Sequence, residues 1–300
     1  MPDTQGDVTR SDHNELGTCD PNAVLKAVER LRGSIEGKVL DEQGNIPTFF
    51  DNYVISSLEG IEKQVRDALP TEKFPGLMRL IEHFSEVTAG DRFVPWVERA
   101  AATRARMRLP WELTRVQIYA GQGVSRCLSW RDRPLFKSVF DFAVYPMLLQ
   151  ELRPATIIEL GSGSGASAIW FADILRLFGI AGKVYSLDLL KPDIQDRDVI
   201  FIEGDANRIE AIARASGIDR APHPWLVIED AHVNTIRVMR YFTDIMDPGD
   251  YLVVEDSFNK LADLACFDRE YGKWLRVDTR YTDFFGRNTV SGEDSIFIRV

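Results

Sequence analysis

The spacing of apolar residues divides the chain into a helical first part and an alternating second part. Apolar residues recur at helical spacing in residues 22–31, 55–69, 74–87 and 93–109, which predicts a helix in each range. Residues 1–20 are polar with few large apolar side chains, a pattern typical of a disordered tail. The first part of the chain is therefore expected to be a helical region that follows a disordered tail.

From about residue 154, short β-rich apolar runs alternate with helical stretches. The expected strands are 156–160, 183–187, 199–202, 225–228, 251–254, 274–277 and 295–300, and the expected helices are 166–178, 206–216 and 235–246. Near-continuous apolar strands that alternate with helices predict an α/β fold, a Rossmann-like and mostly parallel sheet of seven strands covered on both faces. The last two strands lack a helix of comparable length between them, so we expect an antiparallel ending.

Composition narrows the class of partner. The 300 residues are 45% hydrophobic and 27% charged, with a formal net charge of -10. An acidic surface repels phosphate backbones, so nucleic acid is not the expected partner. The N-terminus lacks the apolar core of a signal peptide, and no apolar run approaches the ~18 residues of a membrane span. Because the three cysteines form neither a disulfide framework nor a zinc pattern, we expect a cytoplasmic protein that binds no membrane.

Acidic residues follow five successive predicted strands. Parallel sheets bind ligands at the carboxyl ends of their strands, so side chains at these positions are candidates for a site. The acids in chain order are Glu159, Asp188, Asp205, the pair Glu229 and Asp230, and the pair Glu255 and Asp256. Their order predicts a polar site along one edge of the sheet.

The first strand leads into a glycine-rich turn that opens a helix. The turn and the start of the helix contain Gly161, Ser162, Gly163, Gly165 and Ser167. Glycines there permit a tight turn and let a ligand lie against the backbone. Asp188 lies 25 residues after Gly163 at the end of the next strand, where a carboxylate can accept both hydroxyl protons of a ribose. A turn that merely packs a helix is the simplest alternative.

The turn could bind either a nicotinamide dinucleotide or S-adenosylmethionine. Gly161-x-Gly163-x-x-Ala166 satisfies the permissive dinucleotide fingerprint. Glu159 before the first glycine would repel a pyrophosphate, however, and suits the cationic end of S-adenosylmethionine. Asp205 after the third strand offers an acceptor for an adenine amino group. The residues therefore favour S-adenosylmethionine over a nicotinamide dinucleotide.

The segments Glu159-Leu-Gly-Ser-Gly-Ser-Gly165, Asp188 and Asp205 resemble the first three motifs of class I S-adenosylmethionine-dependent methyltransferases. A longer stretch, with Trp130, Lys137, Asp141, the run 152–161 and the run 167–173, resembles the cephalosporin hydroxylase-type family. Members of that family resemble metal-dependent O-methyltransferases of natural-product pathways. The resemblance spans roughly residues 130–300 and implies a class I methyltransferase fold there.

The resemblance implies that one carboxylate after the fourth strand and an acidic pair after the fifth bind Mg²⁺. These are Glu229 or Asp230, together with Glu255 and Asp256. Hard oxygen ligands suit such an ion. The family pattern acid-x-x-His selects Glu229 by its distance from His232, and Asp230 is the other choice. The alternative is that these acids cap helices, as Asp230 and Asp256 could.

His232 is the candidate catalytic residue, because an imidazole beside a bound metal can take the proton of the methyl acceptor. A structural role is the alternative. An iron hydroxylase would need a second histidine, and none is placed to complete a facial triad.

The sequence thus predicts an S-adenosylmethionine- and Mg²⁺-dependent O-methyltransferase of a small-molecule hydroxyl, such as a sugar, polyketide or antibiotic intermediate. A nicotinamide-dependent oxidoreductase, a non-catalytic partner protein on the same fold and methylation of nitrogen are the alternatives. The expected domains are a disordered tail (1–20), a helical lid or dimerisation region (21–130) and a catalytic domain (131–300). We expect a homo-oligomer.

Overall fold

The computed structural model describes residues 25–26, 29–30, 92–103, 128–285 and 290–300. The chain forms two compact units, residues 1–90 and 91–300, and the second contains nearly all the described residues. Residues 25–26 and 29–30 are helical. The predicted tail and the other predicted N-terminal helices lie outside the described residues, apart from 92–103. Within the described ranges, no helix has the length and apolar character needed to cross a bilayer.

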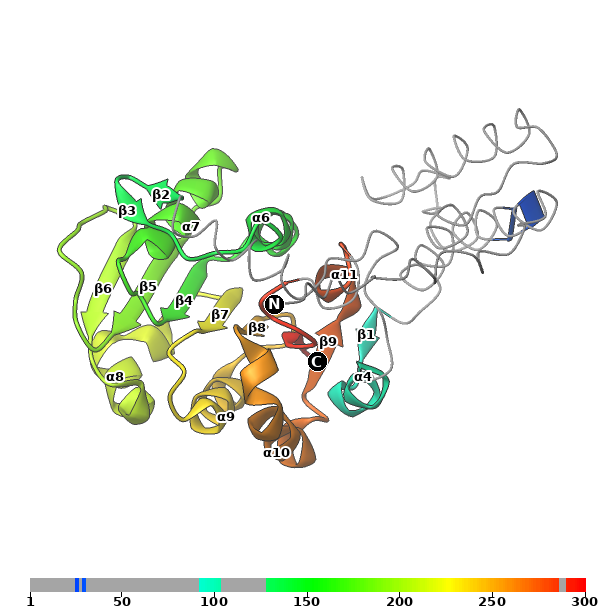
Figure 1. Cartoon of the computed structure of the whole chain (residues 1–300). Coiled ribbons are helices and arrows are strands. Elements are labelled where there is room, and N and C mark those ends of the chain that lie inside the picture. Colours follow the sequence, from blue (N-terminus) through cyan, green and yellow to red (C-terminus); the bar gives the residue numbers. More distant parts are fainter. Residues whose placement is uncertain (1–24, 27–28, 31–91, 104–127, 286–289) are drawn as a thin grey trace, which may run out of the picture. The chain divides into compact units, whose positions relative to one another are not determined.

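An eight-stranded sheet forms the centre of the second unit (Figure 1). Its strands, in spatial order, are β1 (Phe93–Val94), β9 (Leu275–Asp278), β10 (Ile296–Arg299), β8 (Tyr251–Val254), β7 (Trp225–Glu229), β4 (Thr156–Leu160), β5 (Lys183–Asp188) and β6 (Val199–Glu203). Strands β6, β5, β4, β7 and β8 are parallel, whereas β10 is antiparallel to both β8 and β9. The predicted Rossmann-like sheet with an antiparallel ending is confirmed.

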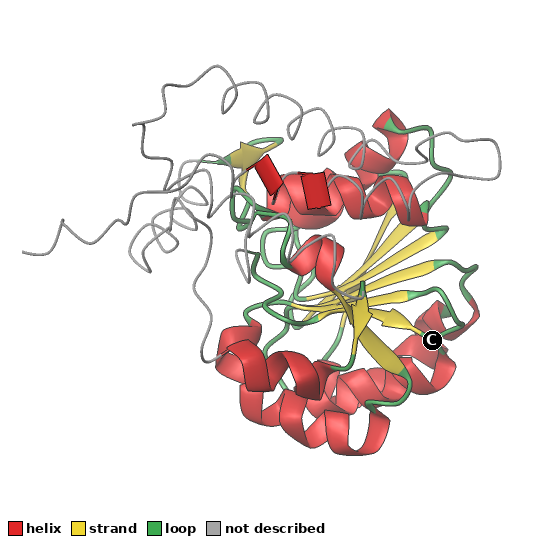
Figure 2. Cartoon of the chain, turned by 90° about the vertical axis from the view of Figure 1, so that its right-hand side faces the viewer, coloured by secondary structure: helices red, strands yellow, loops and turns green. Residues whose placement is uncertain are grey.

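Helices cover both faces of this sheet (Figure 2). One face packs against α6 (Asp141–Leu152) and α7 (Ala166–Leu177), and its core includes Ile157, Trp170 and Val253. The other face packs against α4 (Trp96–Thr103), α8 (Ile209–Ser216), α9 (Thr235–Ile245) and α10 (Leu261–Tyr271). Because both faces are covered, every residue of β4 and β7 is buried, which explains their continuous apolar runs.

Short elements complete the second unit. They are the hairpin strands β2 (Ser129–Trp130) and β3 (Arg133–Pro134), the helix α11 (Thr279–Thr282), and the 3-10 turns η2 (Ala206–Arg208), η3 (Ile218–Arg220) and η4 (Ser257–Lys260). The hairpin is fastened to α7, because the Trp130 indole Nε1 donates to Asp173 Oδ2 at 2.7 Å. The Ser164 hydroxyl donates to the Pro134 carbonyl at 2.7 Å and ties the segment after the hairpin to the glycine turn.

The structure corrects the predicted elements in three places. Phe93 and Val94, expected in a helix, form the edge strand β1, and the helix begins at Trp96. The predicted helix 206–216 is a 3-10 turn followed by α8. Helices α6 and α10 were not predicted, and α6 contains Pro146, which interrupts the sequence signal of a helix.

Candidate active site

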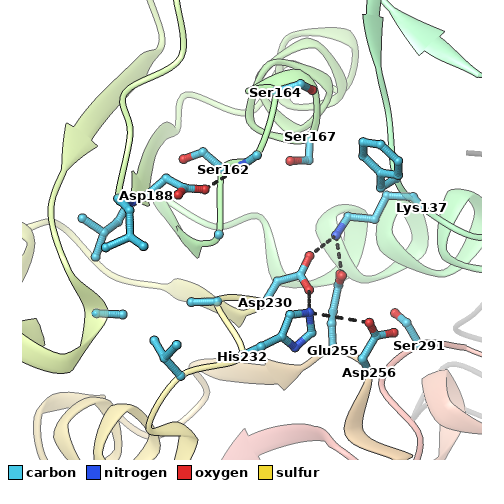
Figure 3. A pocket seen from close by; sticks show the side chains of 18 of the residues that line it. Lys137, Ser162, Ser164, Ser167, Asp188, Asp230, His232, Glu255, Asp256 and Ser291 are labelled. Carbon is cyan, nitrogen blue, oxygen red and sulfur yellow. Dashed lines mark hydrogen bonds and ion pairs between the residues drawn. The ribbon is translucent and has the colours of Figure 1, made fainter. Parts of the chain in front are cut away.

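A pocket of about 570 Å³ lies at the carboxyl ends of β4, β5, β7 and β8 (Figure 3). It has two parts. The glycine turn, Asp188, Asp205 and Asn207 line one part, and Lys137, Asp141, Asp230, His232, Glu255, Asp256 and Ser291 line the other. The predicted edge of the sheet therefore carries a pocket whose two groups of polar side chains come from the strand ends and from the segments beside them.

Only glycine fits at two positions of the turn between β4 and α7. Gly161 has φ +105°, and a Cβ built there would lie 2.6 Å from the carbonyl oxygen of Asp230. Gly165, just before α7, has φ +80° and would clash mildly with Ile194 and Pro192 at 3.0 Å. Positive φ and close backbone approach are conditions that glycine meets without strain. The turn thereby lies directly against the loop that carries Asp230.

Asp188 is fixed at the end of β5 by two backbone amides. Gly163 N donates to Asp188 Oδ2 at 2.8 Å, and Leu189 N donates to Oδ1 at 2.7 Å. Asp205 is fixed similarly, since its carboxylate accepts from the amide of Asn207 at 2.9 Å. Both acids line the pocket beside the turn, so two carboxylates of fixed orientation face the space next to the glycines.

Glu159 lies beneath the pocket and is fully buried, while Ser162 and Ser167 of the turn line the pocket itself. Ser186 Oγ donates to Glu159 Oε2 at 2.6 Å, and Ser162 Oγ lies 2.6 Å from Ser186 Oγ. Burial raises the pKa of Glu159. The structure therefore places Glu159 below the floor, where it can act on a ligand through Ser162 and Ser186 rather than by contact.

At the end of β7, Glu229 and Asp230 occupy different environments. The Glu229 side chain is fully buried outside the pocket, 2.6 Å from Lys260 Nζ, and it also accepts from His232 N at 3.1 Å. Asp230 lines the pocket, with Oδ2 3.4 Å from Lys137 Nζ and Oδ1 3.3 Å from His232 Nε2. Of the two acids left open by the sequence, Asp230 is the one that faces the pocket.

At the end of β8, Glu255 is buried and Asp256 is half-exposed. Glu255 accepts from Lys137 Nζ and from the Tyr145 hydroxyl, each at 2.5 Å. Asp256 adopts φ +48°, and its Oδ2 lies 3.6 Å from His232 Nε2. One ligand atom from each of Asp230, His232 and Asp256 can lie within 4.8 Å of the others, a spacing suited to a single metal ion.

The electrostatics of this cluster favour a bound cation. Burial and the charge of Glu255 raise the pKa of Asp230 well above its usual range. Against the opposing effect of burial, the ammonium of Lys137 lowers the pKa of Glu255.

Neither Asp230 nor Asp256 caps a helix: the residue before α9 is Asn234, and the Asp256 side chain makes no capping bond to η4. The acids are thus free of the capping role that the sequence allowed.

Lys137, Asp141 and Ser291 are among the pocket residues to which the sequence analysis assigned no role. Lys137 and Asp141 lie in the stretch that resembles the family, and Ser291 had no signal at all. The carboxylate of Asp141 accepts from Ser138 N at 3.0 Å and from Ser291 N and Oγ at 3.1 and 3.0 Å. Lys137 is 3% exposed, and a buried lysine among acids could be found only once the strand ends were placed in space.

The strand order β6-β5-β4-β7-β8-β10-β9, with β10 antiparallel, and a pocket over the glycine turn define a Rossmann-like methyltransferase domain. A family model described as Rhamnosyl O-methyltransferase/CmcI matches residues 122–284. The chain belongs to this family, which confirms the resemblance found in the sequence.

Relatives and solved structures agree with this assignment. A rhamnosyl O-methyltransferase of Mycobacterium leprae (strain TN) is 33% identical over 150 residues, which cover 46% of this chain and 64% of that protein. One from Mycobacterium tuberculosis (strain ATCC 25618 / H37Rv) is 33% identical over 132 residues, 41% of this chain and 54% of that protein. The chain thus spans less than two thirds of the length of these relatives. An apo structure of CmcI shares 28% identity and a TM-score of 0.51, covering 58% of this chain and 76% of CmcI.

Proposed function

We propose that this protein transfers the methyl group of S-adenosylmethionine to a hydroxyl oxygen of a small molecule, with Mg²⁺ bound beside the acceptor. The observation that carries the proposal is the single pocket that joins a glycine turn and Asp188 to a second group of carboxylates. The family match and the relatives named rhamnosyl O-methyltransferases supply the type of reaction.

The first part of the pocket suits S-adenosylmethionine. Asp188 is held by two amides with its oxygens toward the pocket, as an acceptor for ribose hydroxyls should be. Asp205 is the proposed acceptor for the adenine amino group. Glu159 is linked to the turn through Ser186 and Ser162, and an acidic group there suits the cationic methionine end better than a pyrophosphate. Gly161, Gly163 and Gly165 let the cofactor lie against the backbone, and Ser162 and Ser167 offer hydroxyls.

The second part of the pocket suits a divalent metal ion. Asp230 and Asp256 are the proposed direct ligands, and Glu255 contributes its charge from the wall behind them. The oxygen-rich donor set is the kind that Mg²⁺ prefers. Glu229 is not proposed as a ligand because its carboxylate is paired with Lys260 outside the pocket. When bound, Mg²⁺ lowers the pKa of a hydroxyl that it coordinates and orients that hydroxyl.

The reaction then needs little from the protein beyond positioning and one proton acceptor. The acceptor oxygen forms its bond to the methyl carbon as the carbon–sulfur bond of the donor breaks, and the hydroxyl proton goes to a base. His232 is the proposed base: its side chain is 50% exposed, and its Nε2 lies between Asp230 and Asp256. An imidazole at this point can take the hydroxyl proton as the bond to the methyl carbon forms.

The relatives' names indicate a sugar hydroxyl, and we propose a sugar-bearing natural product as the acceptor class. We also propose that residues 21–130 form a lid or a dimerisation region and that residues 131–300 form the catalytic domain. We further propose that the protein is a homo-oligomer and that it is located in the cytoplasm. Light scattering on the purified protein tests its oligomeric state.

Calorimetry and a radiolabel assay test the proposed function. The purified protein should bind S-adenosylmethionine and should transfer its labelled methyl group to rhamnosylated acceptors only with Mg²⁺ present. EDTA should abolish transfer, and Mg²⁺ added in excess should restore it. Binding of a nicotinamide dinucleotide in place of S-adenosylmethionine would identify an oxidoreductase. A protein that binds neither cofactor would be a non-catalytic relative, and transfer to an amine alone would identify an N-methyltransferase.

A further inference from the structure

Lys137 places a positive charge among the acids of the pocket. Of the described residues that line the pocket, Lys137 alone carries a lysine or arginine side chain. It comes from the segment between β3 and α6, and its ammonium reaches the ends of β7 and β8 (Figure 3). The side chain is 1% exposed, so its charge acts at short range with little screening by water.

The contacts of Lys137 are unequal. Its Nζ lies 2.5 Å from Glu255 Oε2 and 3.4 Å from Asp230 Oδ2. The other oxygen of Glu255 accepts from the Tyr145 hydroxyl at 2.5 Å. Both oxygens of Glu255 are therefore engaged by donors of the chain itself, and Lys137 offsets the charge of this carboxylate. Asp230 Oδ1 and Asp256 Oδ2 instead lie near His232.

We propose that Lys137 matches the charge of the acid cluster to a divalent cation and makes the pocket select Mg²⁺ over trivalent cations. The inference rests on the proposed function, because it takes the metal site of Asp230, Glu255 and Asp256 as given. The ammonium of Lys137 offsets part of the negative charge of the three carboxylates, so the cluster attracts a cation less strongly than it would without Lys137. This loss of attraction is larger for a trivalent ion than for a divalent one.

The physical reason for selectivity is that repulsion between Lys137 and a bound cation grows with the charge of the cation. Removing the ammonium therefore favours Tb³⁺ more than it favours Mg²⁺. Asp141 and Glu159 are also near the cluster and are present in all the variants compared, and the two affinities are compared within each variant before the variants are compared with one another.

Cation binding to the purified full-length protein tests this inference without an acceptor or turnover. The affinities for Mg²⁺ and Tb³⁺ are measured by calorimetry at neutral pH, and the ratio of the two dissociation constants is compared among variants. Lys137→Met should raise the preference for Tb³⁺ over Mg²⁺ at least tenfold relative to the wild type. Lys137→Arg, which keeps the charge, should leave the ratio within about twofold.

Lys260→Met is the matched control. Lys260 is also a buried lysine, 2.6 Å from a carboxylate at a strand end, but its partner Glu229 lies outside the pocket. Its loss should lower the melting temperature without changing the ratio. If Lys137→Met does not melt cooperatively, Lys137→Gln, which keeps a donor toward Glu255, carries the same test.

Two results would overturn the inference. An unchanged ratio in the Lys137→Met or Lys137→Gln protein means that the ammonium does not set the selectivity. A parallel loss of Mg²⁺ and Tb³⁺ affinity means that Lys137 only holds Glu255 in position. Failure of the proposed metal site looks different, because the wild type would then bind neither ion, or Asp230→Asn would bind both as tightly as the wild type.

Discussion

Glu229 and Asp230 are consecutive residues at the end of β7, and their carboxylates lie near different basic side chains. The Glu229 carboxylate is paired with Lys260 at 2.6 Å in the interior, whereas the Asp230 carboxylate lies in the pocket between Lys137 and His232. The bend of the chain after the strand separates the two side chains. Glu229 therefore links β7 to η4, and the Asp230 carboxylate faces the pocket.

This separation predicts opposite effects for two similar substitutions. Asp230→Asn should weaken Mg²⁺ binding at least tenfold and change stability little. Glu229→Gln should leave Mg²⁺ binding within about twofold but lower the free energy of unfolding by about 3–5 kcal/mol, since it leaves the buried Lys260 without its counter-charge. Calorimetry and chemical unfolding of the same preparations measure both effects. If only the Glu229→Gln protein lost Mg²⁺ binding, the metal ligand would be Glu229 and not Asp230.

The hydrogen bonds of Asp188 predict its part in binding the cofactor. Asp188→Ala should weaken S-adenosylmethionine binding by about 1.5–3 kcal/mol, the usual contribution of a hydrogen bond to a charged group. Calorimetry measures this directly. Glu203→Gln is a suitable control, because Glu203 ends the neighbouring strand β6 but is exposed and does not line the pocket. An Asp188→Ala protein that folds and binds the cofactor normally would remove Asp188 from the site.

His232 is predicted to act on the proton of the acceptor. His232→Ala should lower kcat by ~10²–10⁴, the typical contribution of a general base, with cofactor affinity nearly unchanged. The deficit should shrink as the pH rises, because more of the acceptor is then ionised without help. A pH–rate profile of both proteins, with melting curves alongside, makes the measurement. A mutant profile parallel to that of the wild type would leave His232 with a structural role.

A group of ion pairs behind the glycine turn predicts how stability depends on pH. Arg176 bonds to Asp173 and Asp196 and lies on α7, the helix that follows the turn. Although burial opposes it, hydrogen bonds from Arg176 lower the pKa of both carboxyls. A lowered pKa stabilises the folded state above the ordinary range of an aspartate, and this contribution is lost as the pH falls through the lowered values.

Arg176→Met should therefore lower the free energy of unfolding by about 1 kcal/mol at pH 7. The difference from the wild type should shrink as the pH falls below about 4, where the carboxyls take up protons. Thermal melting between pH 3 and 7 follows this difference, and Arg197→Met, whose arginine side chain is 80% exposed, is the control. A difference that stays constant with pH would mean that Arg176 stabilises α7 by packing alone.

The parallel part of the fold could be predicted from the sequence because burial on both faces leaves nearly continuous apolar runs. Strands 156–160 and 251–254 were predicted with their observed bounds. The edge strand β1 could not be, since its two residues pair only with a strand formed by residues 275–278, far along the chain. Periodicity in a short window carries no information on such a partner.

The candidate site could be predicted as a set of strand ends but not as a set of side-chain directions. From the sequence, Glu229 and Asp230 were equivalent candidates at the end of one strand. The structure distinguishes them by their lysine partners, because Glu229 pairs with Lys260 and Asp230 lies near Lys137. Glu159 was expected beside the cofactor, and the alternation of side chains along β4 instead directs it into the interior toward Ser186. Lys137 reaches the cluster from a segment outside the parallel sheet, so no strand-end pattern could include it.

The place of β10 in the sheet has a consequence for how the protein is made. Residues 296–299 insert between β8 and β9 and bond to both. During translation, β8 therefore lacks its neighbour on that side until these residues have left the ribosome. The backbone amide of Val254 donates to the carbonyl of Ser295, so the strand end that carries Glu255 and Asp256 is paired with β7 on one side and gains its bond on the other side only with this late segment. A nascent chain can thus complete the parallel strands from β6 to β8 before β8 is paired on both sides.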